Sequence, residues 1–245
     1  MSVRACVVVP CFNEGERWNA AYWTELLGLD GFRWLFVNDG SHDSTAELAA
    51  HACDGTSSSV LSLPRNVGKA EAVRVGLLDA LSKSPEAPAV GFMDADGAFA
   101  IQDIERILGL FETMKTSTAS VDAVWSSRVA LSGREVRRSP RRHYFGRLAA
   151  TLISWNNLDM PYDTQSGFKL FDPSAEFINV LDTPFDTRWL FEVEMLGRFR
   201  EVTGRPMKVW EEPLYYWQDV PGSKVSPREV VRIGSEILRV RRLTR

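Results

Sequence analysis

The feature that most limits the possible folds is a regular alternation of short apolar runs and segments of helical periodicity over the first 127 residues. Apolar runs rich in β-branched and aromatic residues predict strands. The expected strands are Ala5–Val9, Trp34–Val37, Val60–Leu63, Ala89–Met93 and Ala123–Trp125. The expected helices between them are Glu16–Leu27, Ser44–Cys53, Lys69–Leu81 and Ile101–Met114. This order predicts an α/β fold with helices on both faces of a mostly parallel sheet.

Composition and charge exclude several classes of protein. The 245 residues are 44% hydrophobic and 25% charged, which is typical of a globular chain. A net charge of −3 argues against general nucleic-acid binding. The cysteines Cys6, Cys11 and Cys53 form no disulfide framework, and we find neither a signal peptide nor an apolar run of about 20 residues that could span a membrane. We therefore expect a cytoplasmic protein.

The motifs of several common enzyme classes are missing from the sequence. No G-x-G-x-x-G follows an expected strand, and Gly68-Lys69 is not part of a P-loop because residue 63 is leucine. H-E-x-x-H and G-x-S-x-G are also missing. These observations disfavour hydride transfer from a dinucleotide, P-loop phosphoryl transfer, zinc proteolysis and α/β-hydrolase chemistry.

A pair of carboxylates follows the fourth expected strand, at the edge where parallel sheets bind ligands. The strand runs directly into Asp94-Ala95-Asp96-Gly97. Two carboxylates at this spacing suit Mg²⁺ or Mn²⁺, with phosphate oxygens and water as further ligands. Such an ion would neutralise a diphosphate leaving group. A surface turn is the alternative interpretation of D-x-D-G, and the position after a strand favours the metal site.

Four motifs, each at the carboxyl end of an expected strand, resemble the inverting glycosyltransferases of family 2, which have a GT-A fold and use nucleotide sugars. The motifs are VVVPCFNEGE, FVNDGSHDST, LPRNVGKAEAVRVGL and FMDADG. YDTQSGFKLF at 162–171 and TRWLFEVEML at 187–196 resemble the polyprenyl-phosphate branch, especially the dolichyl-phosphate β-glucosyltransferases. The resemblance extends over about residues 3–220. It implies one GT-A domain at 1–220, with a nucleotide-sugar half at 1–127 and an acceptor half at 128–220.

Three residues depart from the pattern of that branch. Ser166 stands where cysteine is frequent, and Glu192 stands where aspartate is frequent. Asn38 replaces the first aspartate of the D-D-G-S motif, which leaves Asp39 as the only acid there.

The resemblance also implies a donor site at the ends of the strands. Glu14 would accept from ribose hydroxyls, Asp39 would meet the base or the ribose, and Lys69 would lie near the pyrophosphate or the sugar. The implied donor-binding residues are Pro10, Asn13, Glu14, Asp39, Asn66, Lys69 and Asp94, and the implied metal ligands are Asp94 and Asp96. Turn formation is the alternative for Asn13 and Asn66, and a solvated side chain is the alternative for Lys69.

The acceptor half carries most of the predicted catalytic residues. By resemblance these are Asp96, Asp163, Gln165 and Glu192, and Arg128 joins them as a phosphate-binding arginine at the end of an expected strand. Lys169 shares the Y-D-T-Q-S-G-F-K motif with Asp163 and Gln165, and an ordinary turn into the strand FKLF is its alternative. Acids two positions apart on a helix do not face the same way, so we expect only one of Glu192 and Glu194 to reach the site. The resemblance favours Glu192, which stands at the position of the family's acid.

Basic residues are concentrated in two segments. Residues 128–147 hold seven arginines and one glutamate, and residues 224–245 hold one lysine and six arginines against two glutamates. Arginine binds phosphate through a planar fork, so Arg134, Arg137 and Arg138, with Arg128, are candidates for the acceptor phosphate.

Each basic segment adjoins an apolar pattern of helical spacing, at His143–Leu158 and within Pro227–Arg245. We expect a basic amphipathic helix at 221–245 and peripheral binding to an anionic membrane at its inner, cytoplasmic face. Helices that pack against the core and leave their charges solvated are the alternative.

The reaction that the resemblance implies is transfer of a hexose, expected to be glucose from UDP-glucose, to a polyprenyl phosphate with inversion. A phosphate monoester has a second pKa of about 6, so this nucleophile needs no strong base. One alternative is a soluble family 2 enzyme that glycosylates a hydroxyl group with Asp163 or Glu192 as base. A second alternative is a non-catalytic protein that binds sugar nucleotides.

Overall fold

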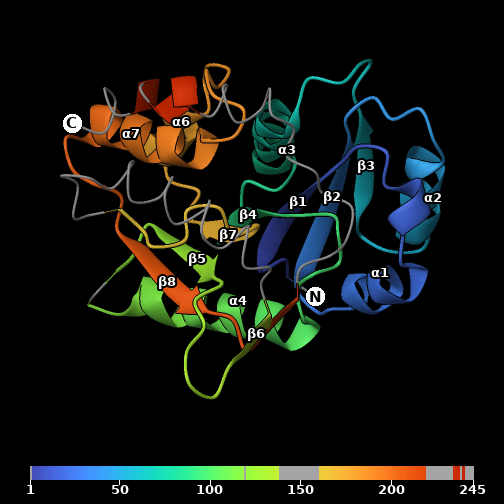
Figure 1. Cartoon of the computed structure of the whole chain (residues 1–245), viewed down its shortest axis with the longest axis horizontal. Helices are drawn as coiled ribbons and strands as arrows, with labels where there is room; N and C mark the ends of the chain where they lie inside the picture. Colours follow the sequence, from blue (N-terminus) through green and yellow to red (C-terminus); the bar gives the residue numbers. More distant parts are fainter. Residues whose placement is uncertain (1, 119, 138–159, 219–233, 238, 241–245) are drawn as a thin grey trace.

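A computed structural model of the chain describes residues 2–118, 120–137, 160–218, 234–237 and 239–240. Within them, the central sheet has the strand order β3-β2-β1-β4-β7-β5-β8 (Figure 1). Its strands are β1 (Ala5–Cys11), β2 (Phe32–Asn38), β3 (Ser59–Ser62), β4 (Val90–Met93), β5 (Ala123–Ser127), β7 (Phe168–Phe171) and β8 (Val209–Pro213). Every neighbouring pair is parallel except those of β7, which runs antiparallel to β4 and β5. The predicted mostly parallel sheet is confirmed.

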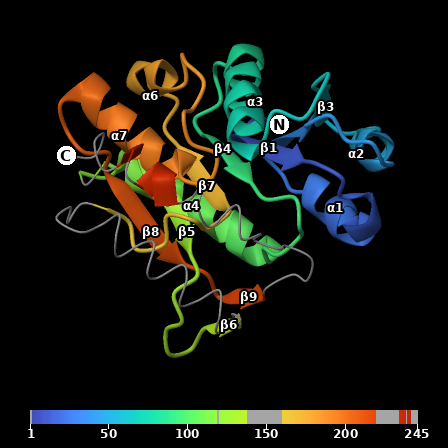
Figure 2. The ribbon, with the colours of Figure 1, turned by 45° about the horizontal axis from the view of Figure 1, so that its top comes forward.

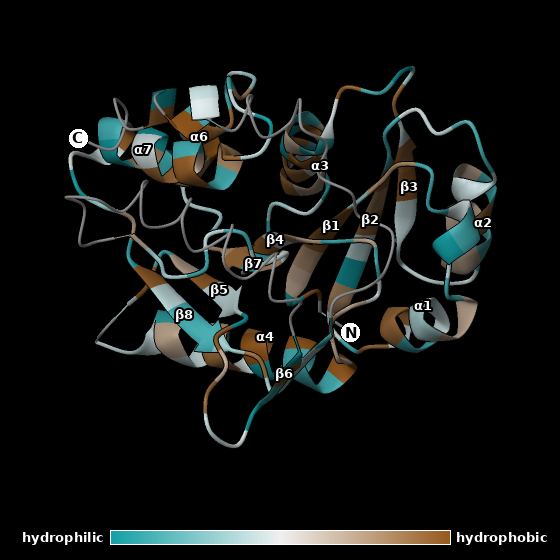
Figure 3. Cartoon of the chain, in the orientation of Figure 1, coloured by the Kyte–Doolittle hydropathy of each residue, from teal (hydrophilic) through white to brown (hydrophobic). Residues whose placement is uncertain are grey.

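Helices cover both faces of this sheet, as predicted. Alternate residues of β1 point to opposite sides, so Val7 and Val9 pack into one core and Cys6 and Val8 into the other. The first core includes residues of α1 (Ala20–Leu27), α2 (Thr45–Cys53) and α4 (Ile101–Thr116). The second includes residues of α3 (Lys69–Lys83), α6 (Ala175–Val180) and α7 (Phe191–Thr203). Figure 3 colours most of β1 and β2 as hydrophobic, as expected for strands buried on both faces.

One predicted helix begins later than expected. The chain first forms a short 3-10 helix, η1 (Gly15–Arg17), and α1 starts at Ala20 instead of Glu16. Asn19 sets this boundary because its side-chain oxygen accepts the Tyr22 N–H at 3.1 Å and so caps α1.

A small ribbon stands apart from the main sheet and carries part of the basic segment. Strands β6 (Glu135–Arg137) and β9 (Tyr216–Gln218) pair in parallel, and Figure 2 shows them side by side away from the other strands. Trp217 of β9 is buried against Phe99, with ring centroids 5.0 Å apart, and this contact holds the ribbon to the core.

Only part of the predicted C-terminal helix lies within the described residues, at 234–237 and 239–240, and these residues are helical. Val240 is fully buried against Leu190 and Val193, and Ile237 packs against the same cluster. Core packing, the alternative to a membrane-facing surface, therefore holds for Ile237 and Val240. Arg138 and the stretch His143–Leu158 lie outside the described residues. In the part of the chain that the structure describes, no helix is both long and apolar enough to cross a bilayer.

Candidate active site

The loops that follow β1 and β2 are linked to each other by hydrogen bonds. Asn13 adopts a positive φ of 53°, its N–H donates to Ser41 Oγ at 3.1 Å, and its Oδ1 accepts the His42 N–H at 3.0 Å. The Glu14 N–H donates to Thr45 Oγ1 at 2.8 Å. Asn13 therefore forms the turn that was its alternative interpretation, and it also joins the two loops. Its contact with a nucleoside, like that of Pro10 in β1, stays a prediction.

Asp39 is almost completely buried and binds the turn before α3. Its Oδ1 accepts the Val67 N–H at 2.7 Å, and its Oδ2 accepts the Gly68 N–H at 2.8 Å and Asn66 Nδ2 at 3.0 Å. Both oxygens are therefore already engaged, and the main effect of Asp39 in this structure is to fix residues 66–68. Asn38, one of the three departures from the family pattern, is also engaged within the protein, since its Oδ1 accepts the Ser41 N–H at 3.0 Å.

Three carboxylates meet where β1 and β4 end. The pKa of Asp96 is raised by burial and by the charge of Asp94. The pKa of Glu14 is raised by burial, and Asp96 and Asp94 raise it further, although Arg17 opposes this effect. Glu14 Oε2 is buried without a hydrogen-bond partner in the described structure. The three carboxylates outnumber the two cations paired with them, Arg17 and Lys69, and a divalent cation would compensate the remaining negative charge.

The predicted metal ligands fit such a cation. Asp94 and Asp96 both follow β4, and Asp96 Oδ1 also accepts the Ala98 N–H at 3.1 Å. Among the described residues, no group of three or more His, Cys, Asp or Glu side chains is arranged to hold a metal. Any ion here would need phosphate and water oxygens beside the two aspartates, which is the coordination that Mg²⁺ and Mn²⁺ adopt with nucleotides.

Gly167 allows Asp94 to take its position. A Cβ at Gly167 would lie only 2.3 Å from Asp94 Oδ2, and the Asp94 N–H donates to the Gly167 carbonyl at 2.9 Å. Any side chain at position 167 would displace the carboxylate. The glycine of the Y-D-T-Q-S-G-F-K motif is thus required by close packing between the two halves of the predicted domain.

Lys69 lies directly beside this carboxylate. Its Nζ is 2.6 Å from Asp94 Oδ1 and faces the rings of Phe92 and Phe191, at 5.9 and 6.0 Å from their centroids. Burial lowers the pKa of Lys69, but the charges of Asp94 and Glu192 more than offset this, and the net shift is upward. Lys69 therefore stays cationic next to Asp94, where the resemblance places the pyrophosphate.

A second lysine is completely buried behind the first. Lys169 in β7 donates to the Ser166 carbonyl, its Nζ is 3.8 Å from Glu192 Oε1, and it faces the rings of Trp125 and Phe92. Burial lowers the pKa of Lys169 to about 8, and the Glu192 carboxylate partly offsets this effect. Burial also raises the pKa of Glu192, against the opposing charge of Lys169.

The two acids at the start of α7 have separate roles, in agreement with their helical spacing. Glu192 Oε2 accepts from Gln165 Nε2 at 3.4 Å, so it joins two predicted catalytic residues. Glu194 points elsewhere and accepts the N–H groups of Asp186 and Thr187 at 2.9 and 2.8 Å.

Arg128 and Asp163 form a two-point ion pair. Arg128 Nη2 is 2.7 Å from Asp163 Oδ1, its Nε is 2.8 Å from Oδ2, and its backbone N–H also donates to Oδ2 at 2.9 Å. The guanidinium lies 5.5 Å from the ring centroid of Trp217. Three donors from one residue therefore occupy the Asp163 carboxylate, which makes it poorly suited to act as a general base.

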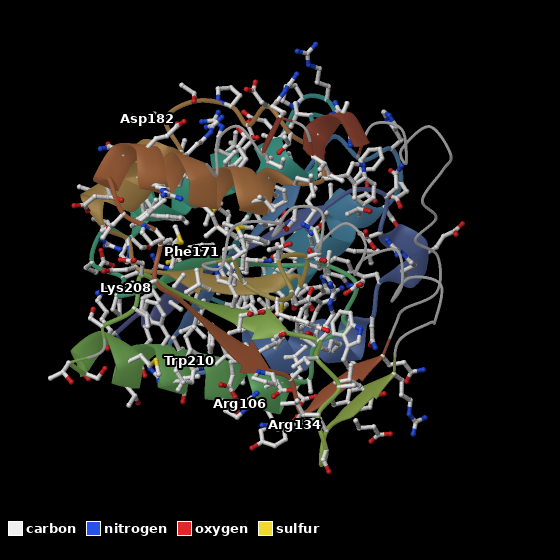
Figure 4. All side chains as sticks on the ribbon, turned by 60° about the vertical axis from the view of Figure 1, so that its left-hand side comes forward. Arg106, Arg134, Phe171, Asp182, Lys208 and Trp210 are labelled. Carbon is white, nitrogen blue, oxygen red and sulfur yellow. The ribbon has the colours of Figure 1, made fainter. Side chains whose placement is uncertain are left out.

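Two of the other predicted phosphate-binding arginines, Arg134 and Arg137, lie beside or in strand β6 of the ribbon. Arg134 stacks on Tyr215, with its Cζ 3.5 Å from the ring centroid, and Arg106 contacts the same ring at 4.5 Å (Figure 4). Arg137 is exposed and pairs with Glu135 at 2.5 Å. Neither of these contacts reaches the carboxylates that follow β4, so the role of both arginines toward an acceptor stays a prediction.

Comparison with known proteins settles the family. The family model for glycosyl transferase family 2 matches residues 6–170. The chain belongs to glycosyl transferase family 2. Among curated family relatives, a dolichyl-phosphate beta-glucosyltransferase of Trichomonas vaginalis is 29% identical over 244 residues, which cover 95% of this chain and 69% of the relative. Proteins with the same description from Saccharomyces cerevisiae and Mus musculus are 28% and 27% identical, covering 90% and 96% of this chain and 68% and 74% of their own lengths.

Solved structures confirm the predicted GT-A fold of this family 2 member. Glucosyl-3-phosphoglycerate synthase from Mycobacterium tuberculosis, in complex with Mn²⁺, UDP and phosphoglyceric acid, has a TM-score of 0.67 at 17% identity, covering 97% of this chain and 77% of that chain. Mannosyl-3-phosphoglycerate synthase from Rubrobacter xylanophilus has a TM-score of 0.68 at 19% identity, covering 98% and 74%.

Sequence reasoning missed several residues that border the family 2 site. Trp217 supports Arg128 from β9, and Ser126 shares a buried hydroxyl contact of 2.6 Å with Ser166. Neither has a motif of its own that would have pointed to it. Arg188 had a signal, because it lies in the TRWLFEVEML motif three residues before α7 begins at Phe191, and its place is considered below.

Proposed function

We propose that this chain transfers glucose from UDP-glucose to a polyprenyl phosphate, with inversion at the anomeric carbon. The observation that carries the proposal is that both carboxylates predicted as possible bases, Asp163 and Glu192, are paired with cations. Asp163 is bound to Arg128 and Glu192 is paired with Lys169, so each candidate base is matched with a cation. An ionised phosphate needs cations and positioning more than it needs a base, whereas a hydroxyl acceptor needs a base. The descriptions of the relatives, which align over both halves of the chain, support the same acceptor.

In this proposal the nucleotide-sugar half holds the donor. Asp94 and Asp96 would bind Mg²⁺ or Mn²⁺, and the bound ion would neutralise charge on the UDP leaving group. Lys69 adds a fixed positive charge beside Asp94, where the diphosphate would lie. Glu14, whose Oε2 has no hydrogen-bond partner among the described residues, would accept from the ribose hydroxyls. Asp39 contributes by holding the turn at 66–68 in place.

The acceptor half would position the phosphate nucleophile. Asp163 holds the planar guanidinium of Arg128 by two points, so Arg128 loses little freedom when it binds a phosphate oxygen. Gln165, held by Glu192, would orient the donor sugar or the acceptor at the same place. Attack from the side opposite the nucleotide would invert the α-linked glucose of the donor to a β-linkage.

The lipid acceptor also requires a membrane surface within reach. We propose peripheral binding to an anionic cytoplasmic leaflet. Exposed Leu131, Tyr215 and Tyr216 lie on or beside the ribbon that carries Arg134 and Arg137, and aromatic and basic side chains together suit a membrane interface.

A panel assay tests the proposed function. The protein is incubated with several nucleotide sugars, Mn²⁺ and either a short polyprenyl phosphate or the matching polyprenol, and products are identified by mass spectrometry. We expect a glycolipid from UDP-glucose and the phosphate, and none from the polyprenol. Product with hydroxyl acceptors alone would support the soluble-acceptor alternative, and UDP-glucose binding without any turnover would support the non-catalytic one.

A further inference from the structure

An arginine that the proposed function does not use lies at the donor end of the site. Arg188 belongs to the loop between α6 and α7, and its guanidinium packs against Gly68. A Cβ at Gly68 would lie 3.7 Å from both Cζ and Nε of Arg188. Gly68 is the N-cap residue of α3 and directly precedes Lys69, whose ammonium pairs with Asp94. Arg188 therefore lies over the turn that leads into Lys69, and the two cationic residues come from different elements.

The turn beneath Arg188 is rigid and carries no acidic partner for it. Asp39 holds the N–H groups of Val67 and Gly68, and Gly68 itself has a φ of +94°, which a residue with a side chain rarely adopts. Arg188 is exposed, and within the described residues it makes no ion pair. An exposed guanidinium without a carboxylate, beside a lysine at a helix start, is suited to bind anionic oxygens.

The loop that presents Arg188 is held by two buried carboxylates. Glu194 of α7 accepts the N–H groups of Asp186 and Thr187, and Glu236 accepts those of the next three residues. The distances to Glu236 are 3.1 Å from Arg188 N, 2.9 Å from Trp189 N and 3.2 Å from Leu190 N. Five consecutive backbone N–H groups, 186 to 190, are thus bound by two side chains. Glu194 is fully buried and Glu236 is 6% exposed, so these bonds are shielded from water.

Glu236 reaches this loop from the C-terminal segment of the chain. The helical residues around it are fixed by Val240, which is buried against Leu190 and Val193, and by Arg239, whose Nη1 donates to the Asp186 carbonyl at 3.0 Å. Figure 1 shows this segment beside the start of α7. A segment with five consecutive amides bound holds its side chains in one place, and the position it defines for Arg188 is over the Gly68–Lys69 turn.

We propose that Arg188 binds phosphate oxygens of a substrate beside Lys69, and that Glu236 is the positioning residue that holds it there. The inference rests on the proposed function for the identity of the substrates. The oxygens belong either to the diphosphate of the donor or to the phosphate of the acceptor, and both present the same chemistry to a guanidinium.

Two binding arms test the role of Arg188 and distinguish the two sources. Calorimetric titration with UDP and Mn²⁺ measures the donor arm without any turnover, and the KM for a short-chain polyprenyl phosphate measures the acceptor arm. We expect Arg188→Ala either to weaken UDP binding or to raise the acceptor KM, by about tenfold or more. This is the range expected for the loss of a hydrogen bond between charged groups. Arg188→Lys should recover only part of the loss, because it keeps the charge but not the planar fork. Lys208→Ala, which removes an exposed cation at the opposite end of β8 from the ribbon (Figure 4), is the control.

The outcomes separate this inference from the proposed function. A loss of UDP affinity in Arg188→Ala supports the donor arm even if no glycolipid forms at all. If the native protein makes glycolipid, and Arg188→Ala keeps both its UDP affinity and its acceptor KM within about twofold of native, the role of Arg188 is refuted while the proposed function stands.

A double-mutant cycle tests the positioning role of Glu236. If Glu236 acts through Arg188, Glu236→Ala should weaken the same arm in the native background and have little further effect once Arg188 is alanine. Glu236→Gln keeps one acceptor oxygen and should therefore recover part of the loss. Thermal melting of both variants would reveal whether a loss comes from unfolding instead. Equal losses from Glu236→Ala in both backgrounds would overturn the positioning role.

Discussion

Lys169 and Glu192 form an ion pair inside the family 2 site, with 3.8 Å between Nζ and Oε1 and with both side chains at most 3% exposed. The pair joins strand β7 to the first turn of α7, and Gln165 completes it through a hydrogen bond to Glu192. Two opposite charges buried together leave the interior nearly neutral, whereas either charge alone would be costly.

This pairing predicts that the single and double variants differ in stability. Lys169→Met should lower the free energy of unfolding by about 3 kcal/mol or more, because it leaves the buried Glu192 charge without its partner. Lys169→Met with Glu192→Gln should recover most of this loss and remain inactive. Denaturant titration measures both. The control is Lys115→Met, which breaks a half-exposed pair with Asp172 and should cost about 1 kcal/mol or less. A double variant no more stable than Lys169→Met would contradict the pairing.

The same lysine predicts a pH dependence of stability. Burial lowers the pKa of Lys169 from 10.5 to about 8, so the unfolded chain binds this proton more tightly than the folded protein does. Between about pH 8 and 10, unfolding therefore takes up a proton at Lys169, and the free energy of unfolding should rise with pH. Over this range, the free energy of unfolding of the native protein should rise relative to that of the double variant Lys169→Met with Glu192→Gln. Parallel curves for the two proteins would show that Lys169 keeps an ordinary pKa.

The carboxylates after β4 predict metal dependence. Asp96→Ala should lower kcat/KM by about 100-fold or more, the usual effect of losing one electrostatic contact to a transition state. A chelator should abolish activity of the native protein, and added Mn²⁺ should restore it. Asp54→Asn, at an exposed carboxylate outside the site, is the matched control and should keep full activity. Full activity of Asp96→Asn in the presence of chelator would exclude the metal role.

The ion pair of Arg128 with Asp163 predicts an effect confined to the acceptor. Arg128→Ala should raise the acceptor KM or lower kcat by about tenfold or more, and it should leave UDP affinity nearly unchanged. Asp163→Ala should have a similar effect because it releases the guanidinium from its fixed position. Arg205→Ala, which breaks an exposed pair with Asp122, serves as the control. Weaker UDP binding in Arg128→Ala would assign this arginine to the donor instead.

Membrane binding can be separated from the structural role of the C-terminal segment. Binding to anionic liposomes should weaken as salt rises, because each basic residue near the surface adds about 1 kcal/mol that salt screens. Replacing Arg241, Arg242 and Arg245 with glutamine should reduce this binding and spare activity on a water-soluble acceptor. Deleting residues 227–245 should reduce both, since Glu236 and Val240 are lost with the arginines. No binding of the native protein at low salt would contradict the peripheral-membrane proposal.

Much of the fold followed from local patterns in the sequence. The apolar runs became β1 to β5 within a few residues of their predicted ends, because strands buried on both faces read as continuous hydrophobic stretches. The position of β7 between β4 and β5 could not be predicted in this way. Its pairing partners lie far away in sequence, and its antiparallel direction is a property of the assembled sheet.

The site was predictable as a set of residues but not as a set of contacts. The motifs pointed to Asp94, Asp163 and Glu192, but the pairing of Asp163 with Arg128 joins residues 35 positions apart, and no spacing rule indicates it. Lys169 illustrates the limit most clearly. Lysine is rarely buried, and the burial of Lys169 depends on partners from other elements, above all the Glu192 carboxylate.

Analysis of the reaction product tests the central claim most directly. Isotopically labelled UDP-glucose is incubated with a short polyprenyl phosphate and Mn²⁺, and the lipid product is purified and examined by NMR. The account predicts a single glucosyl phosphate ester with β configuration from the native protein, and none from Asp96→Ala. An α-linked product, or labelled glucose released only into water or onto hydroxyl groups, would contradict it.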